Sequence, residues 1–223
     1  MDKMIVYEDN VLLVVHKPAG IATETARVGQ ADLVSELKNY RKRKGEDTYI
    51  GVVHRLDQPV EGLLVFAKDG GTAKKLGDEL LRGILTKKYV ALVAGVPQTP
   101  EGDLTDYLLK DGRTNLSKVV PKETKGAKEA SLHWRVLQHN DVVSLLEIEL
   151  YTGRHHQIRV QMAHAGYPLL GDFKYGSAAS KDLSRDSAVN STALLAYEIR
   201  LTNPGTGKEM NFSLNYDKFT KIF

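Results

Sequence analysis

Residues 51–62 read GVVHRLDQPVEG, and this stretch decides how the rest of the chain is interpreted. Two valines lead into a polar segment that places Arg55 two residues before Asp57, and Gln58-Pro59 then breaks the run. In an extended strand the residues at i and i+2 share a face, so Arg55 and Asp57 are predicted to project together from the strand end. The same spacing is also typical of an ordinary surface ion pair at a turn.

The composition indicates a globular protein. The chain has 223 residues, of which 42% are hydrophobic and 26% charged, enough for one large domain or two small lobes. It has no cysteine, which excludes disulfides and thiolate zinc sites. No apolar run approaches the roughly 20 residues of a membrane helix, and the first residues, MDKMIVYEDN, lack the features of a secretory signal. We expect a cytoplasmic protein.

The charge permits a nucleic-acid partner without demanding one. The formal net charge is only +3. The strongest local run is Arg41-Lys42-Arg43-Lys44, which is typical of a solvated helix end and could also attract phosphate.

Short apolar runs bounded by turn residues predict more strands than helices. The pattern therefore favours an α+β fold with a mostly antiparallel sheet. A polar region at 97–130 is interpreted as a flap. Strands are predicted within 4–15 (two, with a turn at Glu8-Asp9-Asn10), 49–56, 63–67, 88–96, 132–137, 142–151, 193–201 and 210–214, and helices over 31–44, 72–85 and 156–165.

A second polar cluster reads TGRHHQIR at 152–159. Together with His164, its two histidines suggest a metal site. Their spacing does not match the H-x-x-x-H pattern of helical zinc sites, and no carboxylate is close in sequence, so we expect no metal. Histidines in such a cluster are more often hydrogen-bonded structural residues or phosphate contacts.

The sequence lacks the common nucleophile and nucleotide motifs. There is no G-x-S-x-G, no G-x-x-x-x-G-K-[ST] and no G-x-G-x-x-G. Neither a serine hydrolase nor an enzyme that uses a nucleoside triphosphate or dinucleotide is indicated.

Five segments stand out, in order along nearly the whole chain. They are YEDNVLLVVHKPAG (7–20), HRLDQPVEGLLVFAK (54–68), KKYVALVAG (87–95), TGRHHQIRVQMAHAGYPLLGDFKYG (152–176) and LTNPGTGKEMNFSL (201–214). Together they resemble the RluA-type pseudouridine synthases. The second segment is similar to that family's H-R-L-D-x-x-x-x-G-L-L-[LV]-x-A-K signature, and the other four resemble its opening, its K-x-Y-x-A segment, its T-G-R-x-H-Q segment and its closing hairpin.

The sequence departs from the family pattern at supporting positions. Val60-Glu61 replaces a pair of small hydroxyl residues, Leu195 replaces a histidine, and Asn203-Pro204 replaces a His-Pro. These changes bear on substrate choice more than on chemistry. Many relatives also carry an N-terminal S4 RNA-binding domain. Here residues 1–223 are expected to be the catalytic domain alone, without an S4 domain.

The resemblance implies both a fold and an activity. The expected fold is α+β, with a mixed, mainly antiparallel sheet in two fused subdomains flanked by helices, and a central RNA-binding cleft. The expected enzyme isomerises uridine in RNA to pseudouridine without metal or cofactor. Asp57 would be the catalytic carboxylate, Arg159 its basic partner and Tyr89 the ring that stacks on the flipped base. An ionised carboxylate in a dry pocket needs such a cation nearby.

The resemblance also suggests how RNA is held. Arg55 is expected to fill the gap left by the flipped base, and the other candidate contacts are His54, Lys17, Arg154, His155 and His156. The substrate is expected to be a stem-loop of ribosomal or transfer RNA, acted on by a monomer. Two alternatives are a catalytically inactive RNA-binding chaperone of the same fold and a hydrolase acting on a nucleoside or phosphate ester.

Overall fold

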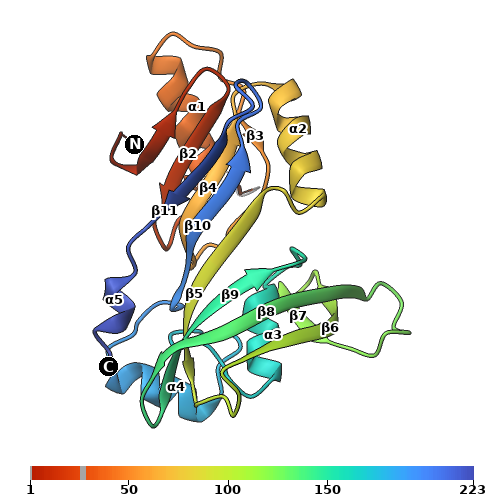
Figure 1. Ribbon diagram of the computed structural model, residues 1–223, viewed down its shortest axis with the longest axis vertical. Helices are drawn as coiled ribbons and strands as arrows, with labels where there is room; N and C mark the ends of the chain where they lie inside the picture. Colours follow the sequence, from red (N-terminus) through yellow and green to blue (C-terminus); the bar gives the residue numbers. More distant parts are fainter. Residues whose placement is uncertain (1, 26–28) are drawn as a thin grey trace. The chain divides into compact units, whose positions relative to one another are not determined.

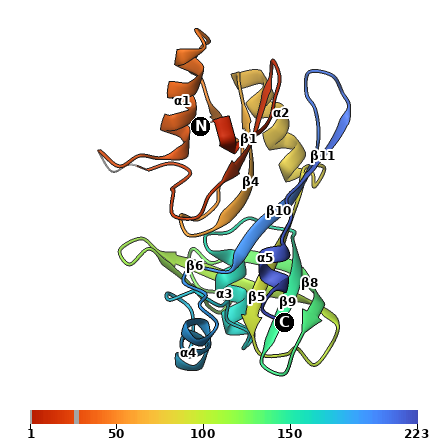
Figure 2. The ribbon, with the colours of Figure 1, turned by 90° about the vertical axis from the view of Figure 1, so that its left-hand side faces the viewer.

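The computed structural model describes residues 2–25 and 29–223, shown in Figure 1 and, turned by 90°, in Figure 2. Contacts divide the chain into two compact units. Unit 1 comprises Met1–Lys87 and Ala196–Asn215, and unit 2 comprises Lys88–Leu195 and Tyr216–Phe223. Each unit is a mostly antiparallel sheet with helices beside it, so the predicted α+β class is confirmed.

The sheet of unit 1 has the strand order β1-β2-β4-β10, with β3 paired to β4 and β11 paired to β10. The β1–β2, β2–β4, β3–β4 and β10–β11 pairs are all antiparallel. Helix α2 packs against β3 and β4. The elements are η1 (Asp2–Met4), β1 (Ile5–Glu8), β2 (Leu12–Lys17), α1 (Leu33–Arg43), β3 (Gly51–Val52), β4 (Glu61–Ala67), α2 (Gly70–Leu81), β10 (Leu194–Thr202) and β11 (Glu209–Ser213).

Capping aspartates start both long helices of unit 1. The Asp32 carboxylate accepts a hydrogen bond from Ser35 N at 2.7 Å, and the Asp69 carboxylate accepts one from Thr72 N at 2.8 Å. Each bond satisfies a backbone N–H that the first helical turn leaves without a partner. The apolar runs of β2 and β4 in the same unit are fully buried, since residues 12–15 and 63–67 are 0% exposed.

Gly62 lets β4 approach β10 closely. Its φ is +142°, and an added Cβ would lie 2.5–2.6 Å from the backbone N and O of Ala196. No side chain fits at that distance, so the glycine that follows the Asp57 segment is required by packing.

The sheet of unit 2 has the strand order β5-β9-β8-β6-β7. All four neighbouring pairs are antiparallel, and α3 packs against β6 and β7 (Figure 1). The elements are β5 (Thr86–Ala94), β6 (Glu101–Asp111), β7 (Leu116–Val119), β8 (Lys128–His139), β9 (Val143–Leu150), α3 (Gln157–His164), α4 (Ala178–Asp186) and α5 (Asp217–Thr220).

Three sequence-based predictions of elements were wrong, and one longer helix was missed. The supposed flap at 97–130 contains β6 and β7, because a half-exposed strand can be polar on its solvent face. The strand predicted over 49–56 is regular only at Gly51–Val52. Helix α2 ends at Leu81 rather than at residue 85, because Gly83 adopts a φ of +69°. Helix α4 was not predicted.

In the described ranges, no helix is both long and apolar enough to cross a bilayer.

Candidate active site

Asp57 lies in an irregular segment of unit 1 between β3 and β4. Its side chain is half-buried, whereas the Arg55 side chain is 73% exposed and lies 4.0 Å from Glu24. The segment is not a regular strand, so strand alternation does not pair these side chains as the sequence predicted. Arg55 is nevertheless available to solvent next to the half-buried carboxylate.

Residues 17–25 hold the Asp57 segment on both sides. Before Asp57, the buried Thr23 hydroxyl donates to Leu56 O at 2.9 Å and accepts from Leu56 N at 3.2 Å. After Asp57, Gly20 N donates to Gln58 O at 2.8 Å, and Gln58 Nε2 donates to Gly20 O at 2.9 Å. The backbone on either side of the carboxylate is therefore fixed, which is the preorganisation that catalysis requires.

Lys17 is a buried residue that contacts the Asp57 segment through Gln58. It is 0% exposed, and its Nζ donates to the carbonyls of Pro18 at 3.0 Å, Ile21 at 2.8 Å and Gln58 at 3.3 Å. Burial lowers its pKa to about 8, against the opposing charges of Asp57 and Glu61. The structure thus encloses the Lys17 ammonium among carbonyl oxygens of the Asp57 segment and its neighbours, and the RNA contact expected of Lys17 stays a prediction.

His54 is also enclosed, being 8% exposed. Its Nε2 accepts from Val65 N at 3.3 Å, so the ring proton belongs on Nδ1. Burial, assisted by the charge of Lys87, holds its pKa well below the usual value, and the ring is neutral. The RNA contact expected of His54 also stays a prediction.

Unit 2 carries the expected basic residue, Arg159. It is 3% exposed on α3, and its guanidinium makes a two-pronged ion pair with Asp172, Nε to Oδ2 at 2.6 Å and Nη2 to Oδ1 at 2.8 Å. Burial disfavours ionisation of Asp172, but the hydrogen bonds and charge of Arg159 outweigh it and lower the carboxyl pKa. The guanidinium also lies 5.1 Å from the ring centre of Tyr175.

Tyr89 lies within β5 of the same unit. It is 5% exposed and sits opposite Ile148 of β9. An aromatic ring with an apolar neighbour on a central strand is held rigidly, which suits a surface on which a base stacks.

The paired histidines form a hydrogen-bonded network with Tyr175 and Ser117. Their rings stack at 3.7 Å, with His155 Nδ1 2.8 Å from Ser117 Oγ and His156 Nδ1 2.7 Å from the Tyr175 hydroxyl. His156 is buried, with a left-handed φ of +55° just before α3. It is thus enclosed like Lys17, whereas His155 is half-buried. The RNA contacts expected of both histidines stay predictions.

The remaining basic candidates differ in exposure. Arg154 is exposed, and its Nε donates to Glu129 O at 2.7 Å. In the run from Arg41 to Lys44, Arg41 is buried and donates to the carbonyls of Tyr49 and Lys68. Part of that run therefore stabilises unit 1 internally.

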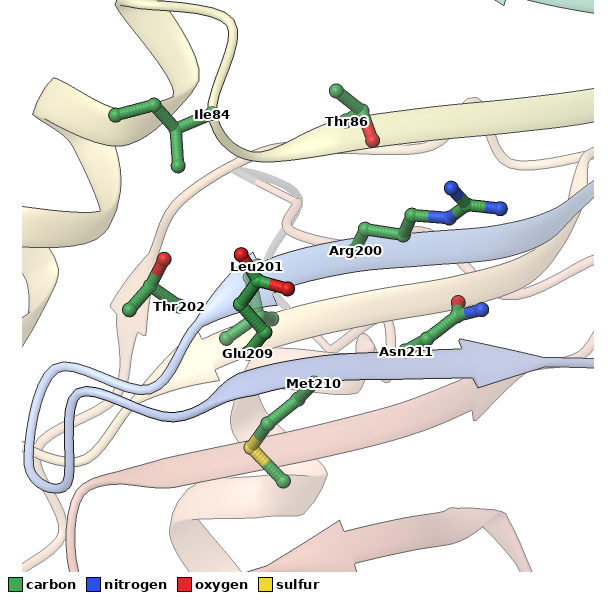
Figure 3. A pocket seen from close by; sticks show the side chains of 8 residues that line it. All are labelled: Ile84, Thr86, Arg200, Leu201, Thr202, Glu209, Met210 and Asn211. Atoms are coloured by element: carbon green, nitrogen blue, oxygen red, sulfur yellow. The ribbon is translucent and has the colours of Figure 1, made fainter.

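The structure also contains a groove of about 680 Å³ that is unrelated to these candidates. It lies in unit 1 between the start of β5 and the β10–β11 hairpin, and Figure 3 shows Thr86, Arg200, Glu209 and Asn211 along it. None of the predicted site residues lines it.

Sequence reasoning missed three residues of the candidate site. Thr23 gave no signal, because its partner is 33 positions away. Asp172 stood within the quoted GDFKYG segment, two residues after an apolar pair, and could have been found as the partner of a buried arginine. Lys87 is the first residue of the K-x-Y segment, but it was given no role.

Over residues 2–25 and 29–223, no group of three or more metal-binding side chains is arranged to hold an ion.

Comparison with known proteins agrees with these features. The family model described as RNA pseudouridylate synthase matches residues 11–164. Two solved structures share the fold, Human RNA Pseudouridylate Synthase Domain Containing 4 (TM-score 0.78, 23% identity, covering 99% of this chain and 91% of that one) and Domain Containing 1 (TM-score 0.76, 22% identity, 98% and 85%).

Curated relatives give the same picture. The chain is 36% identical over 205 residues to "Uncharacterized RNA pseudouridine synthase YhcT" of Bacillus subtilis, covering 91% of this chain and 65% of that protein. It is 31% identical over 220 residues to "Ribosomal large subunit pseudouridine synthase C" of Buchnera aphidicola subsp. Schizaphis graminum, covering 98% and 69%. The chain thus spans about two thirds of the length of these relatives. The family predicted from the sequence is confirmed: the chain belongs to the RNA pseudouridylate synthases.

Proposed function

We propose that this protein isomerises specific uridines of large-subunit ribosomal RNA to pseudouridine. The observation that carries the proposal is the family match over residues 11–164, which includes the clamped Asp57 segment. Relatives named for the ribosomal large subunit favour that RNA over transfer RNA. The absence of cysteine fits a cytoplasmic setting, where ribosomal RNA is modified.

The proposed reaction conserves atoms without an external reagent. The N1–C1′ bond breaks, the base rotates, C5 bonds to C1′, the C5 proton passes to water, and N1 gains a proton. We assign Asp57 the role of acting on the sugar, Tyr89 that of stacking on the extruded base and Arg159 that of balancing the carboxylate charge. Arg55, which is exposed beside Asp57, takes the place of the flipped base, and Arg154 and His155 contact the RNA backbone.

Two routes are open to the Asp57 carboxylate. It can add to C1′ as a nucleophile, or it can take the C2′ proton so that the base leaves by elimination. Deuterium at C2′ slows only the second route when proton removal limits the rate. A primary isotope effect in single turnover therefore selects elimination, and its absence together with a trapped sugar–Asp57 ester selects addition.

The proposal is tested with transcripts of ribosomal and transfer RNA that carry tritium at uracil C5. The expected result is tritium release to water from a large-subunit transcript, with pseudouridine in the digested product. Release from transfer RNA alone would contradict the assigned substrate, and binding of every transcript without release would favour the chaperone. Release of free uracil would indicate the hydrolase.

A further inference from the structure

Lys87 is a half-buried cation without a protein partner. Within residues 2–25 and 29–223 its ammonium group makes no hydrogen bond or ion pair, and burial alone lowers its pKa to about 8. Two fully or largely buried lysines do have partners: Lys68 bonds Glu8 at 2.9 Å, and Lys17 contacts three carbonyls. Burying a charged group without a partner lowers the stability of the fold. An anion from a bound ligand can supply the missing partner.

The register of β5 shows which face Lys87 occupies. Thr86 lines the groove of unit 1 (Figure 3), and Lys88 contacts Glu147 at 3.4 Å. Side chains alternate along a strand, so Lys87 projects from the opposite face, which it shares with Tyr89 at i+2. Tyr89 is the residue assigned to stack on the target base. Lys87 is therefore on the strand face that the proposed reaction uses.

A second donor without an acceptor belongs to His54, which lies in the same unit as Lys87. The Nδ1 of His54 is buried and has no hydrogen-bond partner in the described part of the chain. Burial lowers the pKa of His54, and the charge of Lys87 lowers it further. With Nε2 occupied by Val65 N–H, Nδ1 carries the proton, so both groups offer a hydrogen and neither finds an oxygen. This pairing calls for an anion rather than for a cation or an apolar group.

We propose that Lys87, backed by the neutral His54 ring, forms an anion site that takes one backbone phosphate of the substrate RNA. The site rests on the proposed function, because its ligand belongs to the RNA that carries the target uridine. Lys87 supplies the charge, and His54 supplies a fixed dipole behind it. A phosphate there anchors the backbone on the Tyr89 face of β5 and carries no sequence information.

The adjacent lysine provides a matched control. Lys87→Gln and Lys88→Gln remove the same charge from neighbouring positions, but Lys88 projects from the other face and contacts Glu147. RNA binding is measured as log affinity against log salt for a large-subunit ribosomal transcript, with tritium release recorded separately. Each neutralised phosphate contributes about 0.7–0.9 to that slope, so Lys87→Gln should reduce it by about that amount.

The expected pattern is weaker binding with a reduced slope for Lys87→Gln, an unchanged slope for Lys88→Gln and recovery in Lys87→Arg. Equal slopes for the wild type and Lys87→Gln overturn the proposal, as does an equal loss in both Gln variants.

Lys87→Gln should not lower the unfolding midpoint, since it removes an unpaired charge. If it fails to fold, amine acetylation of the wild type decides instead, because bound RNA must protect Lys87, and its full reactivity in the complex overturns the site. A Lys87-dependent slope without tritium release leaves the site standing and overturns the catalytic proposal.

Discussion

Thr23 and Leu56 exchange two hydrogen bonds across 33 positions of the chain, Oγ1 to O at 2.9 Å and N to Oγ1 at 3.2 Å. Leu56 immediately precedes Asp57, the proposed catalytic carboxylate. The segment that carries the chemistry is thus fixed by a hydroxyl from a distant loop. Fixing the backbone on both sides of a reacting group lowers the barrier without any direct contact with substrate.

Thr23→Val tests this clamp. Valine keeps the shape but leaves the buried N–H and C=O of Leu56 without partners, which costs about 1–3 kcal/mol. We expect kcat to fall by about tenfold to a hundredfold, since misplacement of a reacting group by about 1 Å can cost about a hundredfold, with RNA affinity little changed. Thr23→Ser, which keeps the hydroxyl, should restore kcat. The exposed Thr99→Val is the control, and a kcat for Thr23→Val equal to that of the control contradicts the clamp.

Lys17 gives a pH dependence of stability with a defined sign. Its folded-state pKa of about 8 is below the unfolded value of 10.5, so between these pH values the unfolded chain binds more protons. The free energy of unfolding should therefore rise with pH across that window, by at most about 3 kcal/mol. Chemical denaturation of the wild type and Lys17→Met from pH 7 to 9.5 isolates this contribution. A difference between the two proteins that is flat or falls with pH contradicts the burial of a charged Lys17.

Asp172 is predicted to be essential to the position of Arg159. Asp172→Asn leaves a buried guanidinium without its carboxylate and should lower the free energy of unfolding by about 3–5 kcal/mol. The matched control is Asp182→Asn, which breaks the exposed pair with Arg185, whose side chains are 68% and 65% exposed. That change should cost less than about 1 kcal/mol. Equal losses, measured by urea denaturation, would show that burial does not strengthen the Arg159–Asp172 pair.

Gly62 and Gly77 are predicted to respond in opposite directions to alanine. Gly62→Ala drives a methyl group into the backbone of Ala196 and should destabilise unit 1 severely. Gly77 lies inside α2 with nothing within 4 Å of an added Cβ, so Gly77→Ala should stabilise by about 0.5–1 kcal/mol. Thermal unfolding measures both, and tolerance of Gly62→Ala contradicts the close approach of β4 to β10.

The sequence predicted well those elements whose burial is complete. The runs VLLVV and LLVFA gave β2 and β4 directly, since a fully buried strand is apolar on both faces. Strand β6 was missed because its exposed side chains include Asp103 and Thr105, so a polar composition concealed a regular strand. The local sequence pattern is therefore a poor predictor of a strand when polar residues dominate one of its faces.

The candidate site shows the same limit. The family motifs identified Asp57, Tyr89 and Arg159, but chain order alone could not show that Lys17 is enclosed by three carbonyls. Lysine is almost always exposed, so an RNA contact was the natural interpretation. Burial of a charged group is a tertiary property. It depends here on the packing of the end of β2 against the Asp57 segment, which the local sequence does not show.

The most direct test of the account compares the wild type with Asp57→Asn on a C5-tritiated large-subunit ribosomal transcript under single-turnover conditions. Asparagine preserves the size of the side chain and removes the carboxylate. We expect tritium release by the wild type, no detectable release by Asp57→Asn, and the same RNA affinity for both proteins. Full release by a folded Asp57→Asn would contradict the central claim that Asp57 carries out the isomerisation.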